Sequence, residues 1–390
     1  MSNVVSFLAS HIIIGDDMEI LKESAINVSE GKILSIAAPS RDANVVDLGN
    51  SLISPMFINA HCHLGDTGAK ELGIGLPLEQ VVNPPDGVKH QFLNNLNPEL
   101  LQQHIRNGLK EMLEHGIIAC ADFREQGLNG IEIIKNASND LPINVIILGR
   151  MAESKPYQET WDEAVEILKN ANGLGIRDIE AYPISLLKDL RKMFPEKIIS
   201  IHVSESFEAE QKSKKEYGVG QAIKSLDFSP DFVVHLTHTQ KSELNLIAES
   251  RTRAVCCPRA NSILGDGLPD VASWHQAGIE FSLGTDNLMF SSPDMFREMD
   301  FLSRMLRGLH KNPAVIDTME IFKASTINGA KALKIDHKLG SLTPGKEASF
   351  NVINLDSQNL TYTHDPISAL VHRANINDIR NIYIKGEKFL

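Results

Sequence analysis

Apolar and polar residues follow two different rhythms along the chain. Up to residue 52, short runs rich in β-branched residues are separated by turn sequences such as Gly15-Asp16 and Glu30-Gly31-Lys32, which predicts a small antiparallel sheet. After Leu52, short apolar runs alternate with longer segments of helical periodicity, and a β-like pattern returns near residue 340. Each terminal segment is too short to bury a core alone, so we expect the two to pair into one small β domain.

The central rhythm predicts eight strands that alternate with helices. The candidate strands are 53–60, 117–123, 143–150, 176–182, 198–203, 232–235, 254–257 and 280–284. The candidate helices are 98–115, 130–138, 160–171, 184–193, 207–226, 242–250, 269–276, 293–310 and 317–333. This order predicts an α/β fold, a (β/α)8 TIM-like barrel over residues 53–339, with residues 1–52 and 340–390 forming a small β-sandwich domain. An open doubly wound sheet is the rival, but it would need a glycine-rich phosphate turn after the first strand.

The net charge and the cysteine content indicate which classes of partner and which cellular compartment to expect. A net charge of −12 disfavours binding to nucleic acid or to an anionic membrane, so small substrates are expected. The first residues lack a signal-peptide pattern, and no apolar run is long enough to cross a bilayer. Four cysteines form neither a disulfide framework nor a Cys-x-x-Cys zinc pair. These features predict a cytoplasmic protein.

Two histidines end the first barrel strand. In an extended strand, His61 and His63 point to the same face, whereas Cys62 points to the other and is not counted as a ligand. The pair alone is ambiguous, because two polar residues at a strand end are as common as a metal site. The carboxyl ends of the strands of a barrel converge, so the other strand ends decide the matter.

Three further strand ends carry residues of the same chemistry. The fifth strand is followed by His202 and Glu205, the sixth ends at His235, and the eighth is followed by Asp286. The predicted end of the fourth strand, Ala181-Tyr182, offers no lysine that could be carbamylated to bridge two metals. We therefore expect a site for a single metal ion at this end of the barrel.

These motifs resemble those of the amidohydrolase superfamily. The matching segments are His61-Cys-His63, His202-Val-Ser-Glu205, His235, Cys257-Pro-Arg-Ala-Asn261, Gly284-Thr-Asp286 and Leu342-Thr-Pro-Gly-Lys-Glu-Ala348. The resemblance is to the mononuclear branch that includes guanine, cytosine and S-adenosylhomocysteine deaminases and the triazine hydrolases. It covers nearly the whole chain, and in that family the small β domain is likewise built from both termini.

The resemblance implies a role for each motif residue. His61, His63, His202 and Asp286 would bind one divalent ion, Zn²⁺, with Fe²⁺ as the alternative. Asp286 would also take a proton from the metal-bound water, and His235 would orient the hydroxide. Glu205 would pass a proton to a ring nitrogen of the substrate. A homodimer or homotetramer is an expectation from the family alone.

Other residues are weaker candidates for binding the substrate. Arg124, Arg259 and Asn261 follow strands and are expected to contact substrate, with salt-bridged or turn-forming roles as the alternative. His238 lies beyond its strand and matches no required role. The glycine-rich connection 64–97 is expected to be a lid or substrate loop. It lacks the tryptophan usual in nucleoside-type deaminases, so only the reaction class is predicted.

Three functions follow from these observations. The first is a metal-dependent hydrolytic deaminase of a purine, pyrimidine, pterin or triazine ring, with metal hydroxide attacking the amidine carbon. The second is a metal-dependent C–N hydrolase of another type, such as a cyclic amidase or a triazine dealkylase or dechlorinase. The third is a catalytically silent binding protein on the same barrel.

Overall fold

The structure is a computed structural model that describes residues 4–153 and 155–390. The chain folds into two compact units. One unit holds the residues up to Ile58 together with Met112–Ile118 and Asp294–Leu390, and the other holds Asn59–Glu111 and Ala119–Pro293. Among the described residues, no helix is both long and apolar enough to cross a bilayer.

The first unit contains a sheet built from both ends of the chain. Its strands are β1 (Val5–Ile14), β2 (Glu19–Ser29), β3 (Lys32–Ala37), β4 (Asn44–Asp47), β5 (Ser51–Pro55), β15 (Phe350–Asn354), β16 (Ile379–Ile384) and β17 (Glu387–Lys388), in the order β17-β16-β15-β5-β1-β2-β3, with β4 on β1. Strand β5 joins the two ends, because it pairs with β1 on one side and with β15 on the other. Phe7 packs its ring against Phe350 and Tyr383, with ring centroids 5.2 and 4.7 Å apart. The domain boundaries at residues 52 and 340 stay a prediction.

The helices of the first unit differ from the sequence-based expectation. They are α12 (Met295–His310), α13 (Thr318–Ala324), α14 (Ile327–Ala332) and α15 (Pro366–His372). The single helix predicted over 317–333 is wrong, because the hydroxyls of Ser325 and Thr326 bond back to the carbonyl of Phe322 and the chain breaks there. Helix α15, a short helix capped by Asp365, was not predicted.

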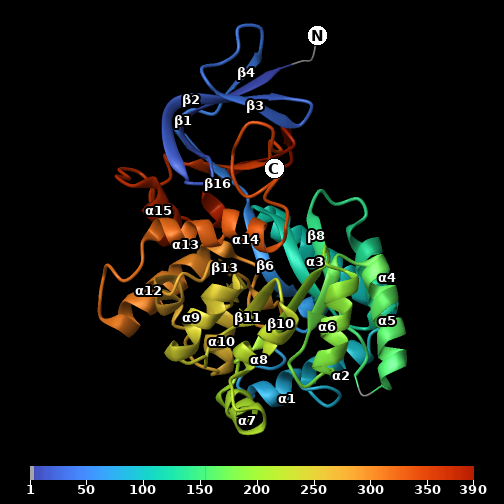
Figure 1. The fold of residues 1–390 in the computed structure, drawn as a ribbon. Helices are drawn as coiled ribbons and strands as arrows, with labels where there is room; N and C mark the ends of the chain where they lie inside the picture. The colour runs from blue at the N-terminus through green and yellow to red at the C-terminus, as the bar shows by residue number, and fades with distance from the viewer. Residues whose placement is uncertain (1–3, 154) are drawn as a thin grey trace. The chain divides into compact units, whose positions relative to one another are not determined.

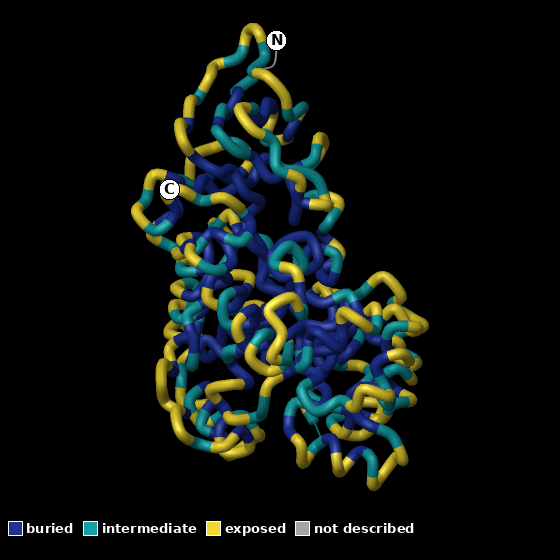
Figure 2. The backbone as a smooth tube through the Cα atoms, turned by 90° about the vertical axis from the view of Figure 1, so that its left-hand side faces the viewer, coloured by how far each residue is buried: buried dark blue, intermediate teal, exposed yellow. Residues whose placement is uncertain are grey.

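The second unit carries the parallel strands (Figure 1). They are β6 (Phe57–His63), β7 (Ile117–Arg124), β8 (Asn144–Gly149), β9 (Gly173–Ile176), β10 (Ile198–Val203), β11 (Phe232–His235), β12 (Arg253–Cys256), β13 (Phe281–Leu283) and β14 (Asp286–Asn287), in the order β13-β12-β11-β10-β9-β8-β7-β6-β14. The first two residues of β6, Phe57 and Ile58, and of β7, Ile117 and Ile118, belong to the other unit. Figure 2 shows that long stretches of the chain are buried, as expected for parallel strands covered on both faces.

Strands β13 and β14 close this sheet on itself. Leu283 pairs with Cys256 of β12, whereas Asp286, three residues later, pairs with Cys62 of β6. Gly284 makes this possible, since a Cβ there would lie 2.8 Å from both the Cβ and the carbonyl oxygen of His61. The architecture is therefore of the TIM-barrel type, in agreement with the predicted (β/α)8 barrel.

Helices follow most of these strands, and they differ in detail from the prediction. They are α1 (Leu78–Val82), α2 (Val88–Asn94), α3 (Pro98–Glu114), α4 (Gly127–Ser138), α5 (Tyr157–Asn170), α6 (Ile184–Met193), α7 (Phe207–Tyr217), α8 (Gln221–Ser225), α9 (Lys241–Ser250), α10 (Pro258–Leu264) and α11 (Val271–Gln276). The connection 64–97 is ordered rather than a plain loop, because it contains α1, α2 and the 3₁₀ turn Leu64–Gly68. The predicted helix 207–226 is two helices, because Gly218 ends α7 in a left-handed conformation.

Two strand predictions need correction. The apolar run 53–60 is not one strand, because Ile53 belongs to β5 and Phe57 begins β6 in the other sheet. The fourth barrel strand lies upstream of the predicted range 176–182, since β9 ends at Ile176. Periodicity could not separate these cases, because both segments are buried and apolar whichever sheet they join.

Candidate metal centre and substrate pocket

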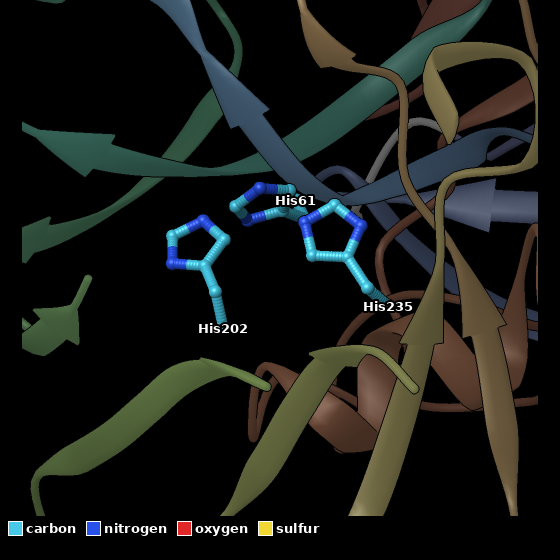
Figure 3. A group of neighbouring side chains, drawn as sticks. All are labelled: His61, His202 and His235. Carbon is cyan, nitrogen blue, oxygen red and sulfur yellow. The ribbon is translucent and has the colours of Figure 1, made fainter. Parts of the chain in front are cut away.

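Four histidines and two acids from separate strand ends meet in the second unit. His61 and His63 come from β6, His202 from β10, and His235 from β11. Figure 3 shows the rings of His61, His202 and His235 turned toward one common space. Within the described residues, one group of possible metal ligands combines these three histidines, another combines His61, His63 and Asp286, and a third combines Glu205, His235 and Asp286.

The carboxylate of Asp286 contacts two of these imidazoles. Its Oδ1 lies 3.2 Å from Nε2 of His61 and 3.4 Å from Nε2 of His63. Burial opposes ionisation of this carboxyl, but hydrogen bonding and attraction from His61, with His235 and His63 nearby, hold its pKa below the ordinary value. Asp286 is therefore a carboxylate at neutral pH.

The imidazoles are neutral, and those of His61, His63 and His235 are buried, whereas His202 is partly exposed. Desolvation lowers the pKa of His61 and His235, lowers that of His63 to about 3, and lowers that of His202 well below its ordinary value. The Nδ1 atom of His202 lies 3.0 Å from the carbonyl oxygen of Ile176. Because that oxygen only accepts, Nδ1 carries the proton and Nε2 keeps its lone pair. Neutral imidazoles beside one carboxylate are the donor set that Zn²⁺ prefers, so these residues fit the predicted metal.

The backbone around the site is strained at several positions. Ser204, His235 and Asp286 have φ values of +52°, +78° and +56°. Side chains other than glycine avoid this left-handed region, and such residues persist where the surrounding structure holds them in place. At His235, the ring is also fixed from the side, because its Nδ1 lies 3.2 Å from Nδ2 of Asn261.

Glu205 lies beside His235 and faces the same pocket. Its Oε1 is 3.4 Å from Nε2 of His235, and one fifth of its side chain remains exposed. Burial, followed by repulsion from Asp286, raises the pKa of Glu205 to about 8. The carboxyl is therefore protonated at neutral pH and can act as an acid.

The structure places the weaker candidates away from the pocket. Arg124 is fully buried between Asp122, at 3.5 Å, and Glu125, so its placement does not support the expected contact with substrate. Arg259 donates to the carbonyl oxygen of Ser292, 3.3 Å away.

Two other residues near the strand ends contact protein groups. Asn261 contacts His235 rather than open space. Nε2 of His238 lies 2.5 Å from the carbonyl oxygen of Asp266. Among the described residues, the lining of the pocket includes none of Arg124, Arg259, Asn261 and His238.

The pocket has a volume of about 310 Å³ and is lined by His63, His202, Glu205, His235 and Asp286 together with residues that the sequence analysis missed. The missed polar residues include Glu79, Lys89, His90, Arg150, Arg177 and Gln221. The strand-end rule could have found Arg150 and Arg177, because they directly follow β8 and β9. No sequence signal marked Lys89 or Gln221, which lie on short helices whose placement depends on the tertiary fold.

Comparison with known proteins agrees with this geometry. Residues 52–388 match the model of the amidohydrolase family. The chain belongs to this family. Within the amidohydrolases, a protein of Methanothermobacter thermautotrophicus that is provisionally named an aminohydrolase is 32% identical, over 90% of this chain and 89% of the relative. A 5-methylthioadenosine/S-adenosylhomocysteine deaminase of Teredinibacter turnerae is also 32% identical, over 95% of this chain and 88% of the relative.

Solved structures share the amidohydrolase fold. The atrazine chlorohydrolase of Arthrobacter aurescens TC1, complexed with zinc, superposes with a TM-score of 0.86 at 17% identity, over 99% of this chain and 95% of that one. The guanine deaminase of C. acetobutylicum, with guanine bound, has a TM-score of 0.80 at 20% identity and covers both chains fully. At these identities the likeness concerns the fold, and it confirms the TIM-barrel type.

Proposed function

We propose that this amidohydrolase is a metal-dependent hydrolytic deaminase of a nitrogen heterocycle. One observation carries the proposal: the carboxyl of Glu205 lies 3.4 Å from Nε2 of His235 and faces the same pocket as His63, His202 and Asp286. An amidine-like ring needs a proton on its ring nitrogen before ammonia can leave, and a carboxylic acid beside the metal ligands supplies it. The deaminase names of relatives support the same reaction.

His61, His63, His202 and Asp286 would hold one divalent ion, and zinc is the metal named for two of the structural neighbours. When bound, such an ion lowers the pKa of water from about 16 towards 7. Asp286, which is ionised at neutral pH, would be the group that takes up a proton. His235 stays neutral, and its ring is fixed by Asn261, so it can donate to or accept from the reacting oxygen.

The test is metal analysis followed by an ammonia-release screen over purines, pyrimidines, pterins and aminotriazines. We expect about one metal ion per chain and ammonia from at least one ring. His202→Ala should lose the metal, and Glu205→Ala should keep the metal but lose ammonia release. A protein that keeps full activity as His202→Ala would contradict the site assignment.

A second candidate function is hydrolysis of a C–N or C–Cl bond in a substrate that is not an amidine. The fold that this chain shares with an atrazine chlorohydrolase supports this candidate. Such a reaction has less need of ring protonation, so Glu205→Gln would then be tolerated. A silent binding protein, the third candidate, would bind a heterocycle equally well with and without metal.

We further propose the cytoplasm as the compartment, because the four cysteines are buried and their spacing shows no disulfide framework. We propose likewise that the protein forms a homodimer or homotetramer. We also propose that its terminal β domain is bounded at residues 52 and 340, and that it binds neither nucleic acid nor a membrane. The net charge of −12 supports the last of these. Size-exclusion chromatography with light scattering tests the assembly.

A further inference from the structure

Ser204, the residue directly before Glu205, is held at each of its polar groups. Its backbone N–H donates to Oε1 of Gln221 over 2.7 Å, and its hydroxyl donates to Oε2 of Glu210 over 2.8 Å. Its carbonyl oxygen accepts from the backbone N–H of His238 over 2.9 Å. These contacts offset the strain of its left-handed backbone and place Glu205 at the pocket.

The contact with Ser204 also decides how the side-chain amide of Gln221 is turned. A backbone N–H can only donate, so the atom that faces Ser204 must be the amide oxygen and not the amide nitrogen. The backbone N–H of Gln221 donates to Oε2 of Glu210 over 3.1 Å, so Gln221 is fixed at both its backbone and its side chain. The amide NH₂ is therefore presented in one direction.

Gln221 is only 3% exposed and lines the same pocket as Glu205. Across residues 4–153 and 155–390, its Nε2 atom forms no hydrogen bond, although its Oε1 does. Nε2 of Gln221 is not among the fully buried polar atoms of the described residues that lack a hydrogen bond, so water in the pocket can reach it and an acceptor on a ligand can replace that water. A fixed donor in a pocket wall is also the usual means of selecting one ligand over a close analogue.

We propose that Gln221 determines substrate specificity by donating a hydrogen bond from Nε2 to an oxo group of the ring, so that amino-oxo heterocycles are preferred over rings without the oxo group. The inference rests on the proposed deaminase function. Gln221 is hydrogen-bonded to the residue before Glu205, and Gln221 and Glu205 line the same pocket. The ring nitrogen that receives the proton from Glu205 cannot also accept from Gln221. In aminopyrimidine and aminotriazine rings this nitrogen lies between the carbon that carries the amino group and a second carbon. When the second carbon carries a carbonyl oxygen, that oxygen can accept the hydrogen bond from Gln221.

If Gln221 only held the backbone of Ser204 in place, it would use its amide oxygen alone. Gln221→Glu separates the two roles, because it keeps an oxygen for the N–H of Ser204 and replaces the NH₂ by an oxygen that cannot donate while ionised. Gln221→Leu removes both groups and serves as the comparison. Melting temperature and metal content, measured for each variant, show whether the fold and the metal site are intact.

The experiment compares metal-loaded enzymes on two pairs of rings that differ only in an oxo group, isoguanine with adenine and cytosine with 4-aminopyrimidine. For the parent enzyme we expect kcat/KM to favour the oxo member of at least one pair by about tenfold or more. Gln221→Glu should remove this preference, because its loss of kcat/KM should be about tenfold larger for the oxo member of the pair than for the other member. Equal losses on both members of each pair, or no preference in the parent, would overturn the inference.

A binding measurement keeps this inference separable from the proposed function. Calorimetric titration with 2-pyrimidinone and with pyrimidine, which have no amino group to lose, should show tighter binding of the oxo ring by the parent but not by Gln221→Glu. If no ring releases ammonia but this difference is present, the deaminase proposal fails and the role of Gln221 stands. If ammonia is released but neither substrates nor probes depend on Gln221, the role of Gln221 fails alone.

Discussion

Lys89 is a buried cation that ties the segment 64–97 to the residues behind the metal centre. Its Nζ lies 2.7 Å from Oε1 of Glu125 and 3.7 Å from Oδ2 of Asp66, and its side chain is 3% exposed. The same Oε1 of Glu125 is 3.3 Å from Nδ1 of His63. Lys89→Met keeps most of the side-chain volume and removes the charge, so it isolates the electrostatic contribution.

Breaking a buried ion pair by removing one partner typically costs 3–5 kcal/mol, because the other charge stays buried. The cost here is expected at the lower end, about 3 kcal/mol, for two reasons. Arg124 still pairs with Glu125. Burial raises the pKa of Asp66 to about 7, so without the attraction of Lys89 this carboxyl takes up a proton instead of remaining an unpaired charge. A loss of 3 kcal/mol corresponds to roughly a hundredfold change in an equilibrium constant.

Hydrogen exchange measures this loss where it occurs. The amides of α1 and α2 should exchange roughly a hundredfold faster in Lys89→Met, because the opening equilibrium of this segment shifts. Lys70→Met is the matched control, since Lys70 lies in the same segment, is 59% exposed and sits 3.9 Å from Glu111. Its effect should stay within about 0.5 kcal/mol. Unchanged exchange in α2 of Lys89→Met would refute the assignment of this pair as the anchor of the segment.

Three further predictions follow from the site and the two sheets. Glu205 acts in its protonated form and its pKa is raised to about 8, so kcat should fall as pH rises through that region, and a rate that still increases above pH 9 would contradict its role as the acid. Phe7→Ala should lower the free energy of unfolding of the first unit by about 3–5 kcal/mol in urea titrations, because Phe7 is 1% exposed, whereas Tyr362→Ala, at 89% exposure, should change it by less than about 0.5 kcal/mol. Gly173→Ala should reduce soluble expression and melting temperature, because its Cβ would lie 1.9 Å from the carbonyl oxygen of Ile198 and a backbone atom cannot move aside; a melting temperature equal to that of the parent would show that β9 adjusts.

The sequence by itself determined the alternation of strands and helices and the residues that end the strands. Apolar runs separated by amphipathic segments indicate a barrel, because this periodicity reflects which side chains must be buried. The strand ends then brought together His61, His202, His235 and Asp286 without knowledge of any distance. This worked because all strands of a parallel barrel end on the same side.

Tertiary structure decided what periodicity cannot encode. The run that contains Ile53 and Phe57 is apolar throughout, and only pairing with β15 or with β14 shows that it serves two sheets. Arg124 ends strand β7, as a residue of the pocket would, yet its guanidinium is buried between acids. The sequence does not show this, because a strand end fixes where a side chain begins, whereas the residues packed around it decide where it points.

The pocket wall shows the same limit at two residues. Lys89 and Gln221 are ordinary polar positions on short helices when the sequence alone is read. Packing buries the ammonium of Lys89 among carboxylates, and one hydrogen bond from Ser204 turns the amide of Gln221. The residues of the metal centre could thus be predicted from local motifs at the strand ends. The residues expected to select the substrate could not, because contacts between segments distant in the chain determine their orientation.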